Sequence, residues 1–178
     1  MRLFCAIDIP GGIKGKLRAL TDRLRPLAKL SWSPVENLHV TTKFIGEWPE
    51  ERLAEIKQAL AAVPRPGPVE IAVRGLGWFP NERNPRVFWA GIECGEDLRK
   101  LARDTEDGVA ALGVPYEDRE FHPHLTLARR RDPVPVDRLR REVAELRDTD
   151  FGTFAANSYS LCLSKGGRYT KLEEFPLP

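Results

Sequence analysis

Two short segments of this chain place a histidine two residues before a threonine. The first is His39-Val40-Thr41-Thr42 and the second is His124-Leu125-Thr126-Leu127. Alternate side chains of a β-strand share a face, so the histidine and threonine of each segment point the same way if the segment is a strand. Two residues of a strand span roughly 6.5–7 Å, about the width of a phosphate group with its hydrogen-bonding shell. Each segment is therefore a candidate half of a phosphate-binding site.

The two motif histidines, His39 and His124, could act as a general acid and a general base. Histidine has an unperturbed pKa of about 6.5, so it can donate or accept a proton near neutral pH. Opening a phosphodiester needs a base beside the nucleophile and an acid beside the leaving oxygen, on opposite sides of phosphorus. The hydroxyls of Thr41 and Thr126 could donate hydrogen bonds to the non-bridging oxygens. This scheme requires no metal and no cofactor.

The repetition of the motif is what favours catalysis. A single His-x-Thr on a strand is weak evidence, because the histidine could be structural and threonine is an ordinary strand residue. Two copies at matching places in a duplicated architecture are much harder to explain as structural. Thr42 has the opposite parity in its strand, so we expect it to face the core.

A third histidine, His122, opens a zinc-binding alternative. His39, His122 and His124 together could supply three imidazole ligands. However, Pro123 perturbs the strand between the last two, and no Asp, Glu or Cys lies at a helpful spacing beside them. We therefore expect no metal site and interpret His122 as a bystander at the edge of a groove.

Basic side chains near the motifs are candidate substrate contacts. Lys43 shares the parity of the first motif histidine and could face an anion, although a solvated strand residue is the alternative. In the arginine run 129–131, Arg129 directly follows the second motif, and Arg130 has the parity of the second histidine and could reach a phosphate. Arg119 is a further candidate contact at the rim of the groove.

Most of the aromatic residues are expected to lie in the core. Trp78 and Phe79 are the exception, because they fall on a predicted loop that could border a groove and stack on a base.

Composition indicates an ordinary globular protein of 178 residues, 42% hydrophobic and 30% charged. No apolar run approaches the roughly 20 residues of a membrane span, and Asp8 and Pro10 interrupt the first segment where a signal peptide would stay apolar. We expect a cytoplasmic protein. The three cysteines are far apart and odd in number, which predicts buried reduced thiols. The net charge of +2 does not indicate a general nucleic-acid coat, so local groups must hold an anionic substrate.

Periodicity predicts a chain of alternating strands and helices. Helices are expected at 13–30, from Pro49 onwards, at 96–112 and from Pro135 or Asp137 onwards. Strands are expected at 2–9, 38–44, 69–76, 86–92, 121–128, 151–156, 159–164 and 169–175.

The order of these elements predicts an α+β fold. Each half of the chain contains a helix, a motif strand, a helix and a strand pair, and the two motif histidines lie about half a chain length apart. Strand pairs favour mainly antiparallel sheets flanked by helices. We expect a bilobal, pseudo-twofold arrangement with the active-site groove between the lobes, built as a single domain over 1–178 from two intertwined lobes.

Beyond the motifs, blocks along nearly the whole chain resemble the 2H phosphoesterases, and within them the LigT-like RNA 2′,3′-cyclic phosphodiesterases. The blocks include the opening strand 2–7, the first motif block 32–46, the segments 77–80 and 87–92, the second motif block 121–129, and the closing segments 161–164 and 167–169. The first motif departs from the family at Thr42, where leucine is common, which affects packing more than chemistry. Lys43 and Arg129 match typical family residues.

The resemblance implies hydrolysis of RNA 2′,3′-cyclic ends to 2′-phosphomonoesters. It implies His39 as the proton donor to the leaving 3′ oxygen, His124 as the base that activates water, and Thr41 and Thr126 as phosphate-binding residues. The expected partner is RNA with a 2′,3′-cyclic end, with tRNA fragments and small nucleotides among the candidates, and the expected state is a monomer. Alternatives on the same fold are reversible 2′–5′ RNA ligation and opening of cyclic nucleotides. A further alternative is a non-catalytic module that binds RNA ends or nucleotides.

Overall fold

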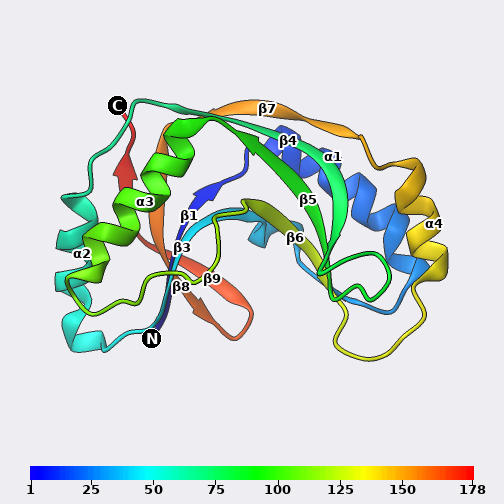
Figure 1. Ribbon diagram of the computed structural model, residues 1–178, viewed down its shortest axis with the longest axis horizontal. Helices are drawn as coiled ribbons and strands as arrows, with labels where there is room; N and C mark the ends of the chain where they lie inside the picture. Colours follow the sequence, from blue (N-terminus) through cyan, green and yellow to red (C-terminus); the bar gives the residue numbers. More distant parts are fainter.

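The computed structural model describes residues 1–178 and contains two antiparallel β-sheets (Figure 1). The first sheet has the strand order β3-β1-β8-β9 and the second the order β2-β6-β5-β4-β7. The strands are β1 (Arg2–Asp8), β2 (Ser31–Trp32), β3 (His39–Glu47), β4 (Val69–Phe79), β5 (Val87–Cys94), β6 (His124–Arg129), β7 (Asp150–Ala156), β8 (Ser158–Lys165) and β9 (Arg168–Pro176). The helices are α1 (Gly11–Leu24), α2 (Leu53–Ala61), α3 (Glu96–Ala110) and α4 (Asp137–Glu145).

The two halves of the chain exchange their strand pairs. The first motif strand, β3, pairs with β1, which pairs with β8 from the C-terminal end of the chain. The second motif strand, β6, pairs with β5, which pairs with β4, and both of these strands precede α3 in the chain. The order β3-β1-β8-β9 therefore corresponds to β6-β5-β4-β7, with a motif strand first in each series. The predicted α+β fold with two antiparallel lobes is confirmed.

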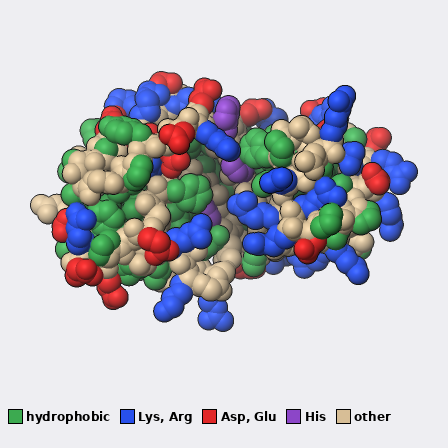
Figure 2. Space-filling view, turned by 60° about the horizontal axis from the view of Figure 1, so that its bottom comes forward, with side chains coloured by type: hydrophobic (Ala, Val, Ile, Leu, Met, Phe, Trp, Pro, Cys, Tyr) green, Lys and Arg blue, Asp and Glu red, His purple; other side chains and the backbone are tan.

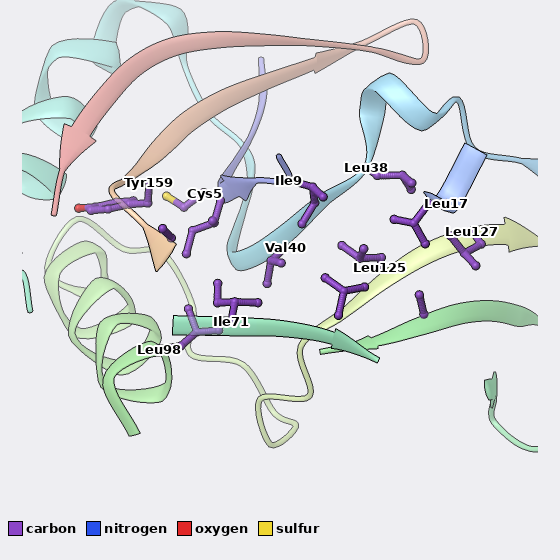
Figure 3. Close-up of a cluster of buried hydrophobic side chains, with 14 of the residues drawn as sticks. Cys5, Ile9, Leu17, Leu38, Val40, Ile71, Leu98, Leu125, Leu127 and Tyr159 are labelled. Carbon is purple, nitrogen blue, oxygen red and sulfur yellow. The ribbon is translucent and has the colours of Figure 1, made fainter. Parts of the chain in front are cut away.

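The helices cover the outer faces of the sheets, and one apolar cluster connects both sheets. Helix α2 contacts β9 of the first sheet, α3 contacts β3 of the first sheet and β4 and β5 of the second, and α1 contacts β7 of the second sheet, with α4 beside α1 (Figure 1). Val40 of β3 and Leu125 of β6 both point into the cluster, which also receives Leu17 from α1 and Leu98 from α3 (Figure 3). The assignment of 1–178 to a single domain stays a prediction, which this shared core supports.

Alternate side chains of β1 lie on two different faces of the first sheet, a core face and an inner face. Leu3, Cys5 and Ile7 belong to the large core, whereas Phe4 and Ala6 belong to a small separate cluster on the opposite face. Alternation along the strand thus leaves one face for the core and one for the groove between the lobes. The histidine side chains lie in this hollow (Figure 2).

Several predicted boundaries differ from the structure. The first helix ends at Leu24 and continues only as a short 3₁₀ segment, because Pro26 has no N–H to extend the helix. Ser31 and Trp32, which lie between the predicted helix 13–30 and the predicted strand 38–44, form the short strand β2 beside β6. The second motif strand begins at His124, directly after Pro123.

Two expectations from composition can be checked against the structure. No helix is long and apolar enough to cross a membrane. All three cysteines are free thiols: Cys5 and Cys162 are buried, while Cys94 is half-buried.

The shared core predicts that Leu125 is essential for stability. Its side chain is 0% exposed between the two lobes. Leu125→Ala is expected to lower the free energy of unfolding by about 2–5 kcal/mol, because a buried cavity remains. Urea unfolding followed by circular dichroism measures this loss. Tyr116→Ala is the control: that ring is 60% exposed, so a change within about 0.5 kcal/mol is expected. Equal losses in both variants would contradict this description of the core.

Candidate active site

The first motif lies on β3 with its chemistry-bearing side chains on the inner face. His39 pairs across the ladder with Asp8, and Thr41 pairs with Ala6. Both motif side chains are half-buried, whereas Val40 between them is fully buried in the core. The histidine and threonine therefore share the groove face, as the alternation predicts.

The second motif repeats this arrangement on β6. His124 pairs with Gly91, and Thr126 pairs with Trp89. Both motif side chains are half-buried, and Leu125 is fully buried. Strands β3 and β6 contact each other although they belong to different sheets. The structure thus brings the two halves of the predicted site together across the groove.

Each motif histidine is fixed by the same hydrogen bond. Nδ1 of His39 lies 2.6 Å from the carbonyl oxygen of Asn37, and Nδ1 of His124 lies 2.8 Å from that of His122. A carbonyl oxygen can only accept, so Nδ1 holds a proton in both rings. The atom left for chemistry is Nε2, which accepts a proton in the neutral ring and donates one in the charged ring.

Aromatic rings set the orientation of both imidazoles. The His39 ring stacks on Phe4 with centroids 4.8 Å apart and meets the edge of Tyr169 at 5.0 Å. The His124 ring meets Phe79 edge-on at 5.0 Å. These contacts restrict ring rotation, which positions each Nε2 before a substrate binds.

The charges around the two histidines differ. Burial lowers the pKa of His39 and the cationic Lys14 adds a small effect in the same direction, while the bond to the Asn37 carbonyl and the Asp8 carboxylate oppose this by favouring the imidazolium. Burial also lowers the pKa of His124, the His122 carbonyl opposes it, and the cationic Arg129 lowers the pKa further. The carboxylate of Asp8 therefore influences His39, whereas the guanidinium of Arg129 influences His124.

A β-bulge follows the threonine in both motifs. It changes the face of the sheet on which the later side chains of the strand lie. The register runs from Ala6↔Thr41 to Cys5↔Lys43 and so skips Thr42. In the second motif it runs from Trp89↔Thr126 to Phe88↔Ala128 and skips Leu127. The extra residue in each strand reverses the parity of the positions beyond it. Thr42 is buried, as predicted, and its hydroxyl has no hydrogen-bond partner.

The predicted placement of Lys43 in the groove is wrong, and the bulge is the reason. Its side chain is 2% exposed on the core side of β3, where Nζ donates to Glu106 at 2.9 Å and to the carbonyl of Pro115 at 2.8 Å. Glu117 lies 3.5 Å from the same amine. Lys43 thus ties the first motif strand to α3 and to the segment that leads into β6.

The bulge in β6 also changes the predicted facing of the arginine side chains after the second motif. Ala128 enters the core, so Arg129 returns to the inner face and is exposed there. The parity argument for Arg130 is wrong: its guanidinium donates to the carbonyl of Val134 at 2.7 and 3.0 Å. Arg119 is exposed in the segment before β6, and the structure gives it no partner.

The predicted aromatic loop is instead the end of β4. Trp78 is a strand residue buried in the core, so its expected place at the groove border is wrong. Phe79 lies at the site through its contact with the His124 ring. The side chain of His122 is 67% exposed, and only its backbone carbonyl takes part in the site. No group of three or more His, Cys, Asp or Glu side chains is placed to hold a metal ion.

Several site residues were missed at the level of sequence. Phe4, Asp8 and Tyr169 contact or influence His39. Asp8 could have been found by aligning the first strand against the motif strand, but the register of that pair is not encoded locally. The carbonyls of Asn37 and His122 leave no signal in side-chain type.

A fold that presents paired histidine–threonine motifs across a groove defines a two-histidine phosphoesterase. The family model described as "LigT like Phosphoesterase" matches residues 7–89 and 92–169, and the chain belongs to this family. An "RNA 2',3'-cyclic phosphodiesterase" of Methanothermobacter thermautotrophicus is 33% identical over 183 residues, covering 99% of both chains.

Solved structures agree with this membership. The crystal structure of TT0787 of Thermus thermophilus has a TM-score of 0.79 and 34% identity, covering 99% of this chain and 98% of that one. LigT of E. coli complexed with 3'-AMP has a TM-score of 0.75 and 26% identity, covering 99% and 97%. The family predicted from the motif blocks is confirmed, and with it the class of enzyme.

The placement of Lys43 predicts a structural loss when its charge is removed. Lys43→Met leaves the Glu106 carboxylate and the Pro115 carbonyl without their partner. We expect stability at pH 7 to fall by about 1–3 kcal/mol, less than for a fully buried pair because Glu106 is partly exposed.

The pH dependence of stability gives a second measurement of the same contact. Burial raises the pKa of Glu106, but the Lys43 hydrogen bond and the backbone N–H of Glu117 outweigh it, so the net pKa is lowered. Stability from this pair is present above the unfolded pKa of about 4.3 and is lost as pH falls through the lower folded value. Lys43→Met should weaken this acid dependence. An unchanged stability with a raised KM would instead place Lys43 in the groove.

Proposed function

We propose that this chain hydrolyses the 2′,3′-cyclic phosphodiester at the end of RNA to a 2′-phosphomonoester, with His39 and His124 as acid and base. The observation that supports this most is the matched pair of imidazoles, each with Nδ1 bound to a backbone carbonyl and Nε2 left free. The names of its full-length relatives support the substrate class.

In the proposed reaction, Nε2 of His124 accepts a proton from water as the water oxygen attacks phosphorus. The bond between phosphorus and O3′ breaks on the opposite side, and its electron pair stays on O3′. Nε2 of His39 donates its proton to O3′, which becomes the free 3′-hydroxyl. The phosphate remains on O2′. Proton exchange with solvent returns both histidines to their starting states.

The inner-face residues beside the histidines would hold the phosphate. The hydroxyls of Thr41 and Thr126 can donate hydrogen bonds to the two non-bridging oxygens, whose charge grows in the transition state. Arg129, exposed on the same face of β6, can add a guanidinium on the base side of the site.

The unequal charges support the assignment of the two roles. Asp8 faces His39 across the ladder and favours its imidazolium, the form that an acid needs. The corresponding position opposite His124 is Gly91, which has no charge. Arg129 favours the neutral form of His124, which a base needs. The mechanism therefore does not rest on family resemblance alone.

The proposal predicts that either histidine is required and that the neighbouring one is not. His39→Ala and His124→Ala should each lower kcat by about 10²–10⁴-fold on an oligonucleotide with a 2′,3′-cyclic end. His122→Ala is the matched control, because it keeps the backbone carbonyl that holds His124, and near wild-type activity is expected.

The product of the same assay shows which bond breaks, the one from phosphorus to O3′ or the one to O2′. Separation of 2′- from 3′-phosphorylated product should give only the 2′-phosphate. Full activity in either motif variant, or a 3′-phosphate product, would overturn the mechanism. Binding without turnover would favour a non-catalytic module, and joining of a cyclic end to a 5′-hydroxyl RNA would reveal the reverse, ligating reaction.

The pH profile of kcat/KM tests the roles separately. The acid limb reports the base and the alkaline limb reports the acid in the free enzyme. Because both histidines have lowered pKa values, the profile should peak below about 6.5. Asp8→Asn removes a charge that stabilises the His39 imidazolium, so the alkaline limb should move to lower pH. Arg129→Gln should raise the pKa of His124 and move the acid limb to higher pH. If Asp8→Asn moved the acid limb and Arg129→Gln the alkaline limb, His39 would be the base and His124 the acid.

A further inference from the structure

We propose that Arg83, Arg86 and Arg131, here called the arginine rim, bind backbone phosphates of the RNA nucleotides that precede the cyclic end. This inference rests on the proposed function and concerns the part of the substrate beyond the reacting phosphate. A 2′,3′-cyclic phosphate ends the RNA chain at its 3′ side. Every other phosphate of the substrate therefore lies on the 5′ side and needs a surface outside the catalytic groove.

The rim is built from two connections that meet where β4 and β6 end and β5 begins, at one end of these neighbouring strands of the second sheet. The N–H of Arg86 donates to the carbonyl of Phe79 at 2.7 Å, and the carbonyl of Arg86 accepts from the N–H of Arg130 at 2.8 Å. These bonds join the β4–β5 connection, which contains Arg83, to the segment after β6, which contains Arg131. The Phe79 ring contacts His124, so the rim begins beside the proposed base.

The three guanidinium groups are available to a ligand. All three residues are exposed, and none of them takes part in an ion pair. Some other exposed arginines of the chain are paired, as Arg74 is with Glu93 and Asp150, so the free state of three neighbouring guanidinium groups at one place is the relevant feature. The nearby carboxylate of Glu82 is already paired with Arg147 at 3.4 Å. Lys and Arg side chains gather on the lobe beside the hollow that holds the histidines (Figure 2).

The local charge is unusual for this protein. The whole chain has a formal net charge of +2, yet the rim places three unpaired cations close to Arg129 in the chain or across the ladder, against one unpaired exposed carboxylate, Asp132. On the opposite side of the site, Lys171 is paired with Asp8 at 2.9 Å and Glu174 at 2.8 Å, which leaves Arg168 as the single exposed arginine beside Tyr169. Guanidinium groups match phosphate geometry and bind it through paired hydrogen bonds. The position of the rim beside the proposed base therefore favours a path of the RNA chain over the second lobe.

A substrate with several phosphates and one with a single phosphate should respond differently to loss of the rim. The test variant is Arg83→Gln/Arg86→Gln/Arg131→Gln. On a hexanucleotide with a 2′,3′-cyclic end, kcat/KM should fall about tenfold at low salt. On 2′,3′-cyclic AMP, which has only the reacting phosphate, kcat/KM should stay unchanged. The slope of log kcat/KM against log salt should decrease by about 2, from roughly 0.7 per single-strand phosphate contact.

A matched variant removes the same charge elsewhere. Lys16, Arg138 and Arg141 are exposed on α1 and α4, outside the groove. Lys16→Gln/Arg138→Gln/Arg141→Gln should leave hydrolysis of both substrates near the wild-type level. An equal loss of kcat/KM on the hexanucleotide in the two triple variants would mean that only the overall charge matters, and it would overturn the proposal. Unchanged hydrolysis of the hexanucleotide by the rim variant would also overturn it, as would equal loss on both substrates.

Binding measured without turnover separates this inference from the proposed function. In a His39→Ala background, fluorescence anisotropy with the labelled hexanucleotide should show weaker binding when the rim arginines are also replaced. If the wild-type chain hydrolyses neither substrate, the proposed function fails, and this binding difference still decides the role of the rim. Equal affinities with and without the rim arginines would reject it.

Discussion

The hydrogen bond from each motif imidazole to the carbonyl two residues earlier is the interaction on which the site depends. It fixes the proton on Nδ1 and leaves Nε2 toward the groove in both His39 and His124. The donor and acceptor belong to the same short segment, so the bond forms wherever the backbone enters the strand at this angle. The duplicated lobes then need only bring two such segments together, which the contact between β3 and β6 achieves.

The sequence was informative where the side-chain pattern is local and misleading where the backbone changes register. His39, Thr41, His124 and Thr126 share the inner face because simple alternation holds through the threonine. One residue later a bulge begins in each strand, and alternation assigns Lys43 to the wrong face. A bulge depends on pairing with β1 or β5, which are remote in sequence, so no pattern within the motif could reveal it.

The fold class followed from element order, whereas the exchange of strand pairs between lobes did not. Turn signals and periodicity located nearly every helix and strand to within a few residues. Partner choice among antiparallel strands depends on long-range packing, such as that of Val40 against the core shared with Leu125. The short strand β2 was missed because two residues are too few for any periodic signal.

Twofold symmetry gives two equal histidines, but acid–base catalysis needs unequal ones. The difference must therefore come from residues that the duplication does not repeat. Across the ladder from the histidines, Asp8 in one lobe corresponds to Gly91 in the other. Beyond the bulges, the first inner-face residue is Phe44 in one motif and Arg129 in the other. These positions lie outside both four-residue motifs, because the motifs supply the reacting groups and the surrounding strands supply the charges that distinguish them.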